Sequence, residues 1–182
     1  MRGNGRRALP DRVVGVGPDG EEWEQRVSDL WAAIDDLTEQ DFLTRMEHLV
    51  AELPPESPVG LFERAGSLDS TGHSDLAVPL YQKALKLGLP GERRRQAVIQ
   101  LASSLRNLGR APESVALLSA ERELESDELD DAVSAFLALA LVDTGREREA
   151  VSLALAALSR HLTRYRRSLA SYARQIADQT SD

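Results

Sequence analysis

Apolar residues recur at helical spacing through most of this chain. In the first such run, Trp23, Val27 and Leu30 stand three and four residues apart, which predicts a helix beginning at Glu21. Runs in which β-branched and polar residues alternate, the pattern of a half-buried strand, are absent from the sequence. The pattern therefore predicts an all-α protein.

A second helix is expected after Thr38. Thr38 with Asp41 three residues later resembles a capping box, in which side chains at the helix start satisfy free backbone N–H groups. The apolar run that follows ends at Pro54–Pro55, where proline cannot continue a helix.

The most informative pattern is an internal repeat. A small residue, a leucine three positions later and a glycine four positions after that occur three times: Ala65, Leu68 and Gly72; Ala102, Leu105 and Gly109; Ala138, Leu141 and Gly145. Each glycine follows an apolar periodic run, where it can adopt the left-handed conformation that ends a helix. A period of this length is typical of stacked helical hairpins, an architecture that binds other molecules.

These signals divide the chain. We expect a disordered tail (1–20), an N-terminal helical extension (21–57), three hairpins (58–91, 92–128 and 129–161), and a C-terminal capping helix and tail (162–182). The prediction is nine helices and no sheet.

Two of the expected helices have distinctive faces. The last one, from about Leu162 to Ala177, carries an apolar stripe of Leu162, Tyr165, Leu169, Tyr172 and Ile176 opposite a row of arginines. The longest apolar run, Ala132–Val142, is too short to span a membrane, which takes about 20 residues. We expect it to be a buried core helix.

The amino-acid composition limits the kinds of site and partner that this protein can have. The chain of 182 residues has no cysteine, which excludes disulfides and thiolate metal sites. A net charge of −8 argues against non-specific nucleic-acid binding, although residues 21–57 are strongly acidic and residues 158–182 are basic. No signal peptide is visible, so we expect a cytoplasmic location, and the dominance of arginine over lysine indicates a GC-rich bacterial source.

The repeats resemble tetratricopeptide repeats, helix–turn–helix units of about 34 residues with small residues at fixed positions. The likeness is clearest in the first unit, through Ala65, Gly72, Ala77, Tyr81 and Ala84. The wider run from Phe42 to Tyr172 resembles a bacterial subgroup often labelled tetratricopeptide repeat group 5. The stretches that carry this likeness are Asp69–Gly72, Ala77–Tyr81, Gln100–Gly109 and Phe136–Gly145. The resemblance implies a protein–protein interaction module without catalytic chemistry or a cofactor.

The later units depart from the family pattern. Ser114 replaces a small apolar residue, and Glu121 stands where Ala84 and Ala157 stand in the other two units. The departures leave the fold prediction intact, but peptide specificity cannot be carried over from better-known members.

Several residues could indicate chemistry, and each is better explained structurally. Gly15–Gly20 matches the dinucleotide fingerprint but has no strand before it and acidic residues after it. The histidines (His48, His73 and His161) lack carboxylates at metal-ligand spacing. Ser103–Ser104 has no readable base or oxyanion hole, and Asp35–Asp36 would diverge on a helix. Arg93–Arg95 could clamp an anion, or could form salt bridges at a helix start.

The concave side of the array is the main candidate site, because the first helix of each pair lines it. The predicted groove residues are Phe62, Asp69, Arg95, Gln96, Ser103, Arg106, Asn107 and Asp143. They offer polar groups and one aromatic ring to a peptide. The alternative is that they only solvate structural helices.

Two functional hypotheses follow. The chain is a non-catalytic scaffold that binds a peptide or helix of another protein in this groove. Alternatively, it is a self-association module whose acidic N-terminal helices dock on the basic C-terminal helix of a second copy, as in a homodimer. Nothing in the sequence supports an enzyme, and a nucleic-acid role for the last helix is weak because its apolar stripe is needed for packing.

Overall fold

The computed structural model describes residues 18–124 and 127–179 of the chain. These described residues form nine α-helices and one short 3-10 helix, without a strand, as the hydrophobic pattern predicted. The elements are α1 (Pro18–Ala32), η1 (Ile34–Asp36), α2 (Glu39–Val50), α3 (Pro58–Ser70), α4 (Ser74–Lys86), α5 (Glu92–Asn107), α6 (Ala111–Arg122), α7 (Asp130–Asp143), α8 (Glu147–His161) and α9 (Arg166–Asp178).

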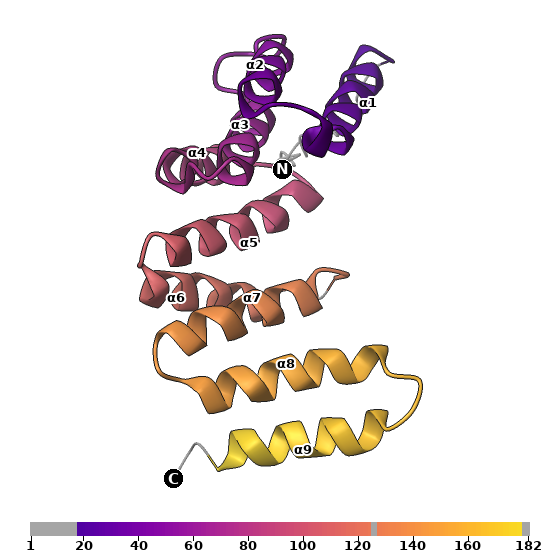
Figure 1. Ribbon diagram of the computed structural model, residues 1–182, viewed down its shortest axis with the longest axis vertical. Coiled ribbons are helices and arrows are strands. Elements are labelled where there is room, and N and C mark those ends of the chain that lie inside the picture. Colours follow the sequence, from indigo (N-terminus) through magenta and orange to yellow (C-terminus); the bar gives the residue numbers. More distant parts are fainter. Residues whose placement is uncertain (1–17, 125–126, 180–182) are drawn as a thin grey trace, which may run out of the picture.

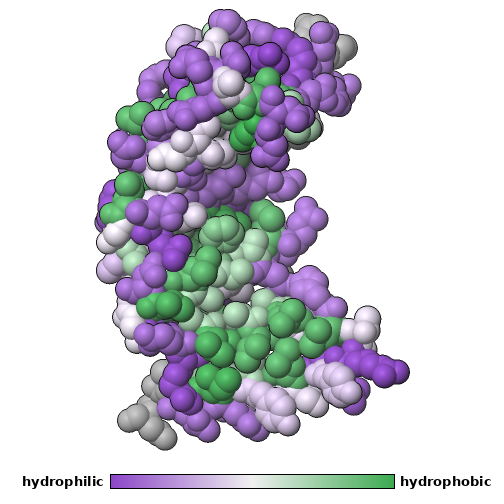
Figure 2. All heavy atoms as spheres, in the orientation of Figure 1, coloured by the Kyte–Doolittle hydropathy of each residue, from purple (hydrophilic) through white to green (hydrophobic). Residues whose placement is uncertain are grey.

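Helices α3 to α8 form three antiparallel hairpins that stack along the long axis of the molecule (Figure 1). The first helices of the pairs also touch one another, α3 on α5 and α5 on α7. The space-filling view has a crescent outline that is hollowed on the right, between α1 at the top and the turn after α8 at the bottom (Figure 2).

The repeated leucine and glycine define the turn inside each hairpin. At the end of α5, Gly109 has φ +74°, and the N–H of Arg110 donates to the carbonyl of Leu105 at 2.9 Å. The N–H of Gly109 donates to Arg106 O at 2.9 Å, which completes a Schellman motif. The same pair of bonds ends α3 and α7, so the repeated sequence encodes one turn geometry three times.

The core is a series of clusters rather than one centre. One cluster joins α3, α4 and α5 around Tyr81, and the next joins α5 to α8 around Leu118 and Leu137. Ala65 and Ala102, the small repeat residues, are fully buried between helices, as the sequence predicted. Such arrays derive their stability from neighbouring contacts.

The N-terminal extension begins slightly earlier than predicted. Helix α1 starts at Pro18, three residues before Glu21, while residues 1–17 of the predicted disordered tail lie outside the described residues. The Thr38 cap is confirmed, because its hydroxyl accepts a hydrogen bond from the N–H of Asp41 at 3.2 Å. Helices α1 and α2 form a separate small cluster around Phe42 and Met46.

The prediction for the last helix is wrong in its start and for the two tyrosines of its stripe, whereas Leu169 and Ile176 of the stripe are half-buried. Helix α9 begins at Arg166, and Tyr165 before it is left-handed with φ +65° and 78% exposed. Tyr172 is also exposed, whereas Ala173 is buried and its carbonyl accepts a hydrogen bond from Ser152 Oγ at 2.8 Å. Small residues let α9 approach α8 closely, and the tyrosine rings are left outside.

Candidate functional site: the inner face of the repeats

A cavity of about 570 Å³ lies between α1, α3 and α5. Phe62 and Gln96, two of the predicted groove residues, line it together with Trp31 and Gln100. Phe62 is buried and its ring lies 6.2 Å from that of Tyr81, so it forms an apolar floor rather than a free hook. The cavity therefore combines an aromatic floor with polar side chains.

Helix α1 forms one wall of this cavity because Gly66 gives it room. A Cβ built on Gly66 would come within 3.2 Å of Trp31 Cζ2. The Trp31 indole N–H donates to Glu63 Oε2 at 2.9 Å, across the helices. The N-terminal extension thus occupies the inner face of the first repeat, and part of the expected groove is filled by the chain itself.

Glu63 connects three helices. Its second carboxylate oxygen accepts a hydrogen bond from Arg93 Nε at 2.9 Å, and Arg93 also pairs with Glu24 of α1. Burial opposes the charge of Arg93, but hydrogen bonds from its guanidinium to Glu24 and Glu63 raise its pKa above the ordinary value. Glu24, Trp31 and Glu63 were missed by sequence reasoning, and the mid-helix glycine Gly66 was the signal that a close approach occurs there.

Burial raises the pKa of the Tyr81 hydroxyl well above its usual range, and the carboxylates of Asp69 and Glu63 add to this effect. Asp69 itself accepts a hydrogen bond from Ser74 Oγ at 2.8 Å, across the turn between α3 and α4. This predicted groove residue is therefore already engaged in holding its own hairpin.

The middle of the array brings two other predicted residues together. Arg106 Nε of α5 lies 2.6 Å from Asp143 Oδ2 of α7. Asn107, next to Arg106, is exposed, and Ser103 one turn earlier is half-buried. One guanidinium edge of Arg106 thus faces Asp143, and Arg has five N–H donors in total.

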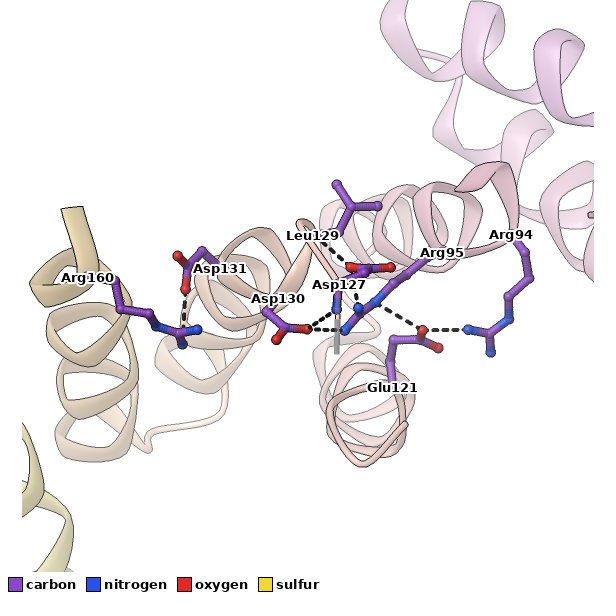
Figure 3. A network of polar contacts seen from close by, with 8 residues as sticks. All are labelled: Arg94, Arg95, Glu121, Asp127, Leu129, Asp130, Asp131 and Arg160. Carbon is purple, nitrogen blue, oxygen red and sulfur yellow. Dashed lines mark hydrogen bonds and ion pairs between the residues drawn. The ribbon is translucent and has the colours of Figure 1, made fainter. Parts of the chain in front are cut away.

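The prediction that Arg95 lines the groove is wrong. Its side chain is only 6% exposed and turns toward the α6–α7 connection, where it pairs with Asp127 and, at 2.8 Å, with Asp130 (Figure 3). Its Nε lies 3.4 Å from Glu121, which also pairs with Arg94. Arginines that open α5 therefore form salt bridges, and they neutralise the buried glutamate that replaces the alanine of the other units.

Other candidate chemistry has structural partners. Ser104 is fully buried and donates to the carbonyl of Gln100 at 3.0 Å, as a helix-packing serine does. His73 lies 2.8 Å from Glu39, and His161 lies 2.8 Å from Asp131. Within residues 18–124 and 127–179, no group of three or more His, Cys, Asp or Glu side chains could hold a metal ion.

The fingerprint-like segment from Gly15 lies mostly outside the described residues, and Pro18–Gly20 form the first turn of α1. None of the helices that the structure describes is long and apolar enough to cross a membrane. The run Ala132–Val142 lies in α7, where Val133, Leu137 and Leu141 are buried, while Leu139 and Val142 remain about half exposed.

Comparisons with known proteins agree with this architecture. A family model described as "Tetratrico peptide repeat" matches residues 58–176, and the chain belongs to this family. Two crystal structures of TPR-like repeats assigned to a kinesin light chain of Podosopora anserina, one of them a point variant, have the same fold. Each has a TM-score of 0.61 and 18% sequence identity, and the alignments cover 88% and 87% of this chain and 96% of each of those chains. No curated protein matches this sequence at a significant level.

Proposed function

We propose that this protein is a non-catalytic, cytoplasmic scaffold that binds a peptide or helix of another protein along the inner face of α3, α5 and α7. The observation that carries the proposal is the cavity between α1, α3 and α5, in which aromatic rings lie beside the amides of Gln96 and Gln100. Extended peptides use such amides to satisfy their backbone groups, while aromatic surface takes an apolar side chain.

Arg106 and Asn107 are the proposed polar anchors in the middle of the groove. Asp143 fixes the direction of the Arg106 guanidinium, and a preorganised guanidinium loses less freedom when it binds a carboxylate or carbonyl. Asn107 beside it is exposed and can serve as donor and acceptor for one peptide unit.

The test begins with a partner isolated from the source cells and identified by mass spectrometry. The affinity of the purified pair is then measured for wild type and for the Arg106→Ala, Asn107→Ala double variant. We expect a loss of about 1–3 kcal/mol of binding free energy, with a nearly unchanged melting temperature. Arg110→Ala is the matched control, because Arg110 at the N-terminal end of α6 forms an ion pair with Glu113 in the first turn of that helix. Equal affinities of the double variant and wild type would exclude the groove.

Self-association is the second candidate, because the basic surface of α9 supports it. Arg166, Arg167 and Arg174 line a groove of about 660 Å³ between α8 and α9. The acidic extension is partly neutralised within the chain, since Glu24, Glu47, Glu52 and Glu56 all have basic partners. A dimer held by the remaining charges should dissociate as salt rises, and sedimentation velocity at two salt concentrations tests this.

A further inference from the structure

Each of the first two hairpins is covered by the first helix of the next hairpin. In α4, Val78 and Tyr81 are buried in one cluster with Leu101 and Leu105 of α5. In α6, Leu118 is fully buried in a cluster with the apolar residues of α7. The side of a hairpin that faces the next one is thus a surface made to receive a helix.

Within residues 18–124 and 127–179, no helix covers the third hairpin in this way. By the repeat register, Val151, Ala154 and Leu158 of α8 correspond to Val78, Tyr81 and Leu85 of α4. Val151 is 47% exposed, Leu158 is 50% exposed, and Ala154 is exposed too. These side chains point to the place where the next first helix would lie.

Helix α9 covers a different face of α8. The buried Ser152 donates a hydrogen bond to the carbonyl of Ala173 in α9. The residues that correspond to Ser152 in α4 and α6, Pro79 and Ala116, are exposed. Among the described helices, α9 packs against α8 without the lateral contact that α5 makes with α3 and α7 makes with α5. It therefore lies on the outer surface and leaves the stacking side uncovered.

One side of α7 is exposed in the same region, next to the uncovered side of α8. Ala135, Leu139 and Val142 correspond to Ile99, Ser103 and Arg106 of α5. Ile99 packs in one cluster with α7, and Arg106 pairs with Asp143 of α7. Ile99 is 6% exposed, but Leu139 and Val142 are 46% and 48% exposed. We call the six residues of α7 and α8 the open face: Ala135, Leu139, Val142, Val151, Ala154 and Leu158. Figure 2 shows hydrophobic atoms gathered over the part of the molecule where α7 and α8 lie.

We infer that the open face binds an amphipathic α-helix of another protein, which docks as a first helix of a following repeat would. The same side of the two preceding hairpins takes a helix in this chain, so the surface is the third copy of an interface that is seen twice. Its area also favours a single helix. An apolar patch of six side chains offers a few hundred Å², whereas a stable pair of globular subunits covers roughly 800 Å² on each partner.

The chemistry of the occupant follows from the surface. All six residues are apolar, so the docked side of the helix must be apolar, with a small residue where the backbones approach. Glu147 is exposed in the first turn of α8, where the corresponding residues Ser74 and Ala111 are buried. In the alternating stack, the last turn of a first helix lies next to this position. A lysine or arginine in the last turn of the occupant would meet Glu147 and also favour its own helix dipole.

The test uses a labelled synthetic peptide that copies α5, Glu92–Asn107, because this helix covers α3 and α4 in the chain and has Arg106 in its last turn. Fluorescence anisotropy measures its binding to the full chain. We expect Leu139→Glu and Leu158→Glu each to weaken binding at least about tenfold, since each would bury an unpaired charge against the helix. Leu76→Glu is the matched control, because Leu76 is 52% exposed on the outer side of α4, and it should bind as wild type does.

A variant peptide and a sedimentation measurement complete the test. A peptide with Leu101→Glu and Leu105→Glu keeps a helical sequence but loses the apolar face, and it should not bind. Equal binding by the open-face variants and wild type, or no binding of the unaltered peptide, overturns the inference. A concentration-dependent dimer in sedimentation that Leu139→Glu abolishes also overturns it, in favour of a second copy as the occupant. Because Leu158 lies on α8, outside the proposed groove of α3, α5 and α7, loss of binding in Leu158→Glu is distinguished from failure of that groove.

Discussion

Replacing Arg95 by methionine should destabilise the second repeat, because Glu121 would lose part of its charge compensation in a buried place. The Glu121 side chain is 3% exposed and that of Arg95 is 6% exposed. Removing one member of a buried ion pair typically costs about 3–5 kcal/mol. Methionine preserves much of the packed aliphatic stem, and Arg94 still donates to Glu121. We therefore expect a loss of about 2–4 kcal/mol in the free energy of unfolding.

A double-mutant cycle separates charge from packing. Glu121→Ala installs the residue type that the other units have at this position, Ala84 and Ala157. In that background Arg95→Met leaves no buried carboxylate behind, so its cost should fall by about 1–3 kcal/mol. Arg110→Ala is the control in the wild-type background. Both side chains of the Arg110–Glu113 pair are exposed, and its loss should leave the free energy of unfolding nearly unchanged.

The assay is urea unfolding followed by circular dichroism, with the slope m compared among the four variants. Repeat arrays can unfold in parts, so an altered m would identify variants in which the second repeat opens separately. Coupling between Arg95 and Glu121 below about 0.5 kcal/mol would refute the reasoning, because independent sites add within that margin. It would mean that Asp127 and Asp130 alone hold Arg95 in place.

Three other outcomes are expected. Ala102→Leu should lower the free energy of unfolding by about 1–3 kcal/mol through overpacking, because Ala102 is fully buried between the helices. An unchanged melting temperature in this variant would contradict the repeat register. Tyr81→Phe should be neutral or stabilise by up to about 1 kcal/mol in chemical unfolding, since within the described residues the buried hydroxyl has no hydrogen-bond partner. A hydrogen bond from Arg110 holds the pKa of Glu113 below its ordinary value of 4.5, so Arg110→Ala should raise that pKa in a carboxylate NMR titration. Because the folded-state pKa of Glu113 is the lower one, its pairing stabilises the fold above the ordinary carboxyl pKa and is lost as the pH falls through the lowered value.

The sequence was sufficient for the hairpins because their signals are local. Gly109 and Leu105 specify a turn through backbone bonds a few residues apart, and Thr38 caps its own helix. The packing of α9 could not be predicted in this way. Its sequence offers an apolar stripe with two tyrosines, but both tyrosines are exposed, and the buried residue of α9 is Ala173, whose carbonyl accepts a hydrogen bond from Ser152 of α8.

The groove residues also differ in whether nearby or distant parts of the sequence determine where their side chains lie. Phe62 and Gln96, which the repeat position assigned to the groove, line the cavity, and Arg106 lies beside Asp143. The repeat position failed for Arg95, because the partners that draw this side chain away, Asp127 before α7 and Asp130 at its start, lie more than thirty residues later in the sequence. A charged residue at a helix start follows its counter-charges, and the repeat pattern does not specify where those lie.

The buried Glu121 and the exposed open face both lie at positions where one repeat unit differs in sequence from the other two. Position by position, the first unit places an aromatic side chain where the second has Leu118 and the third has Ala154. Tyr81 and Leu118 are fully buried under a following helix, whereas the small Ala154 is uncovered. Because Ala154 is small, the surface of α8 is flat here. A helix can therefore lie across Val151 and Leu158 without having to accommodate a large protruding side chain. A surface of this kind is suited to an incoming helix that is exchanged, because its release leaves no large cavity in the core. Ala154→Leu should therefore leave the fold of the chain intact, since the position is exposed, while changing the affinity for the α5 peptide more than the free energy of unfolding.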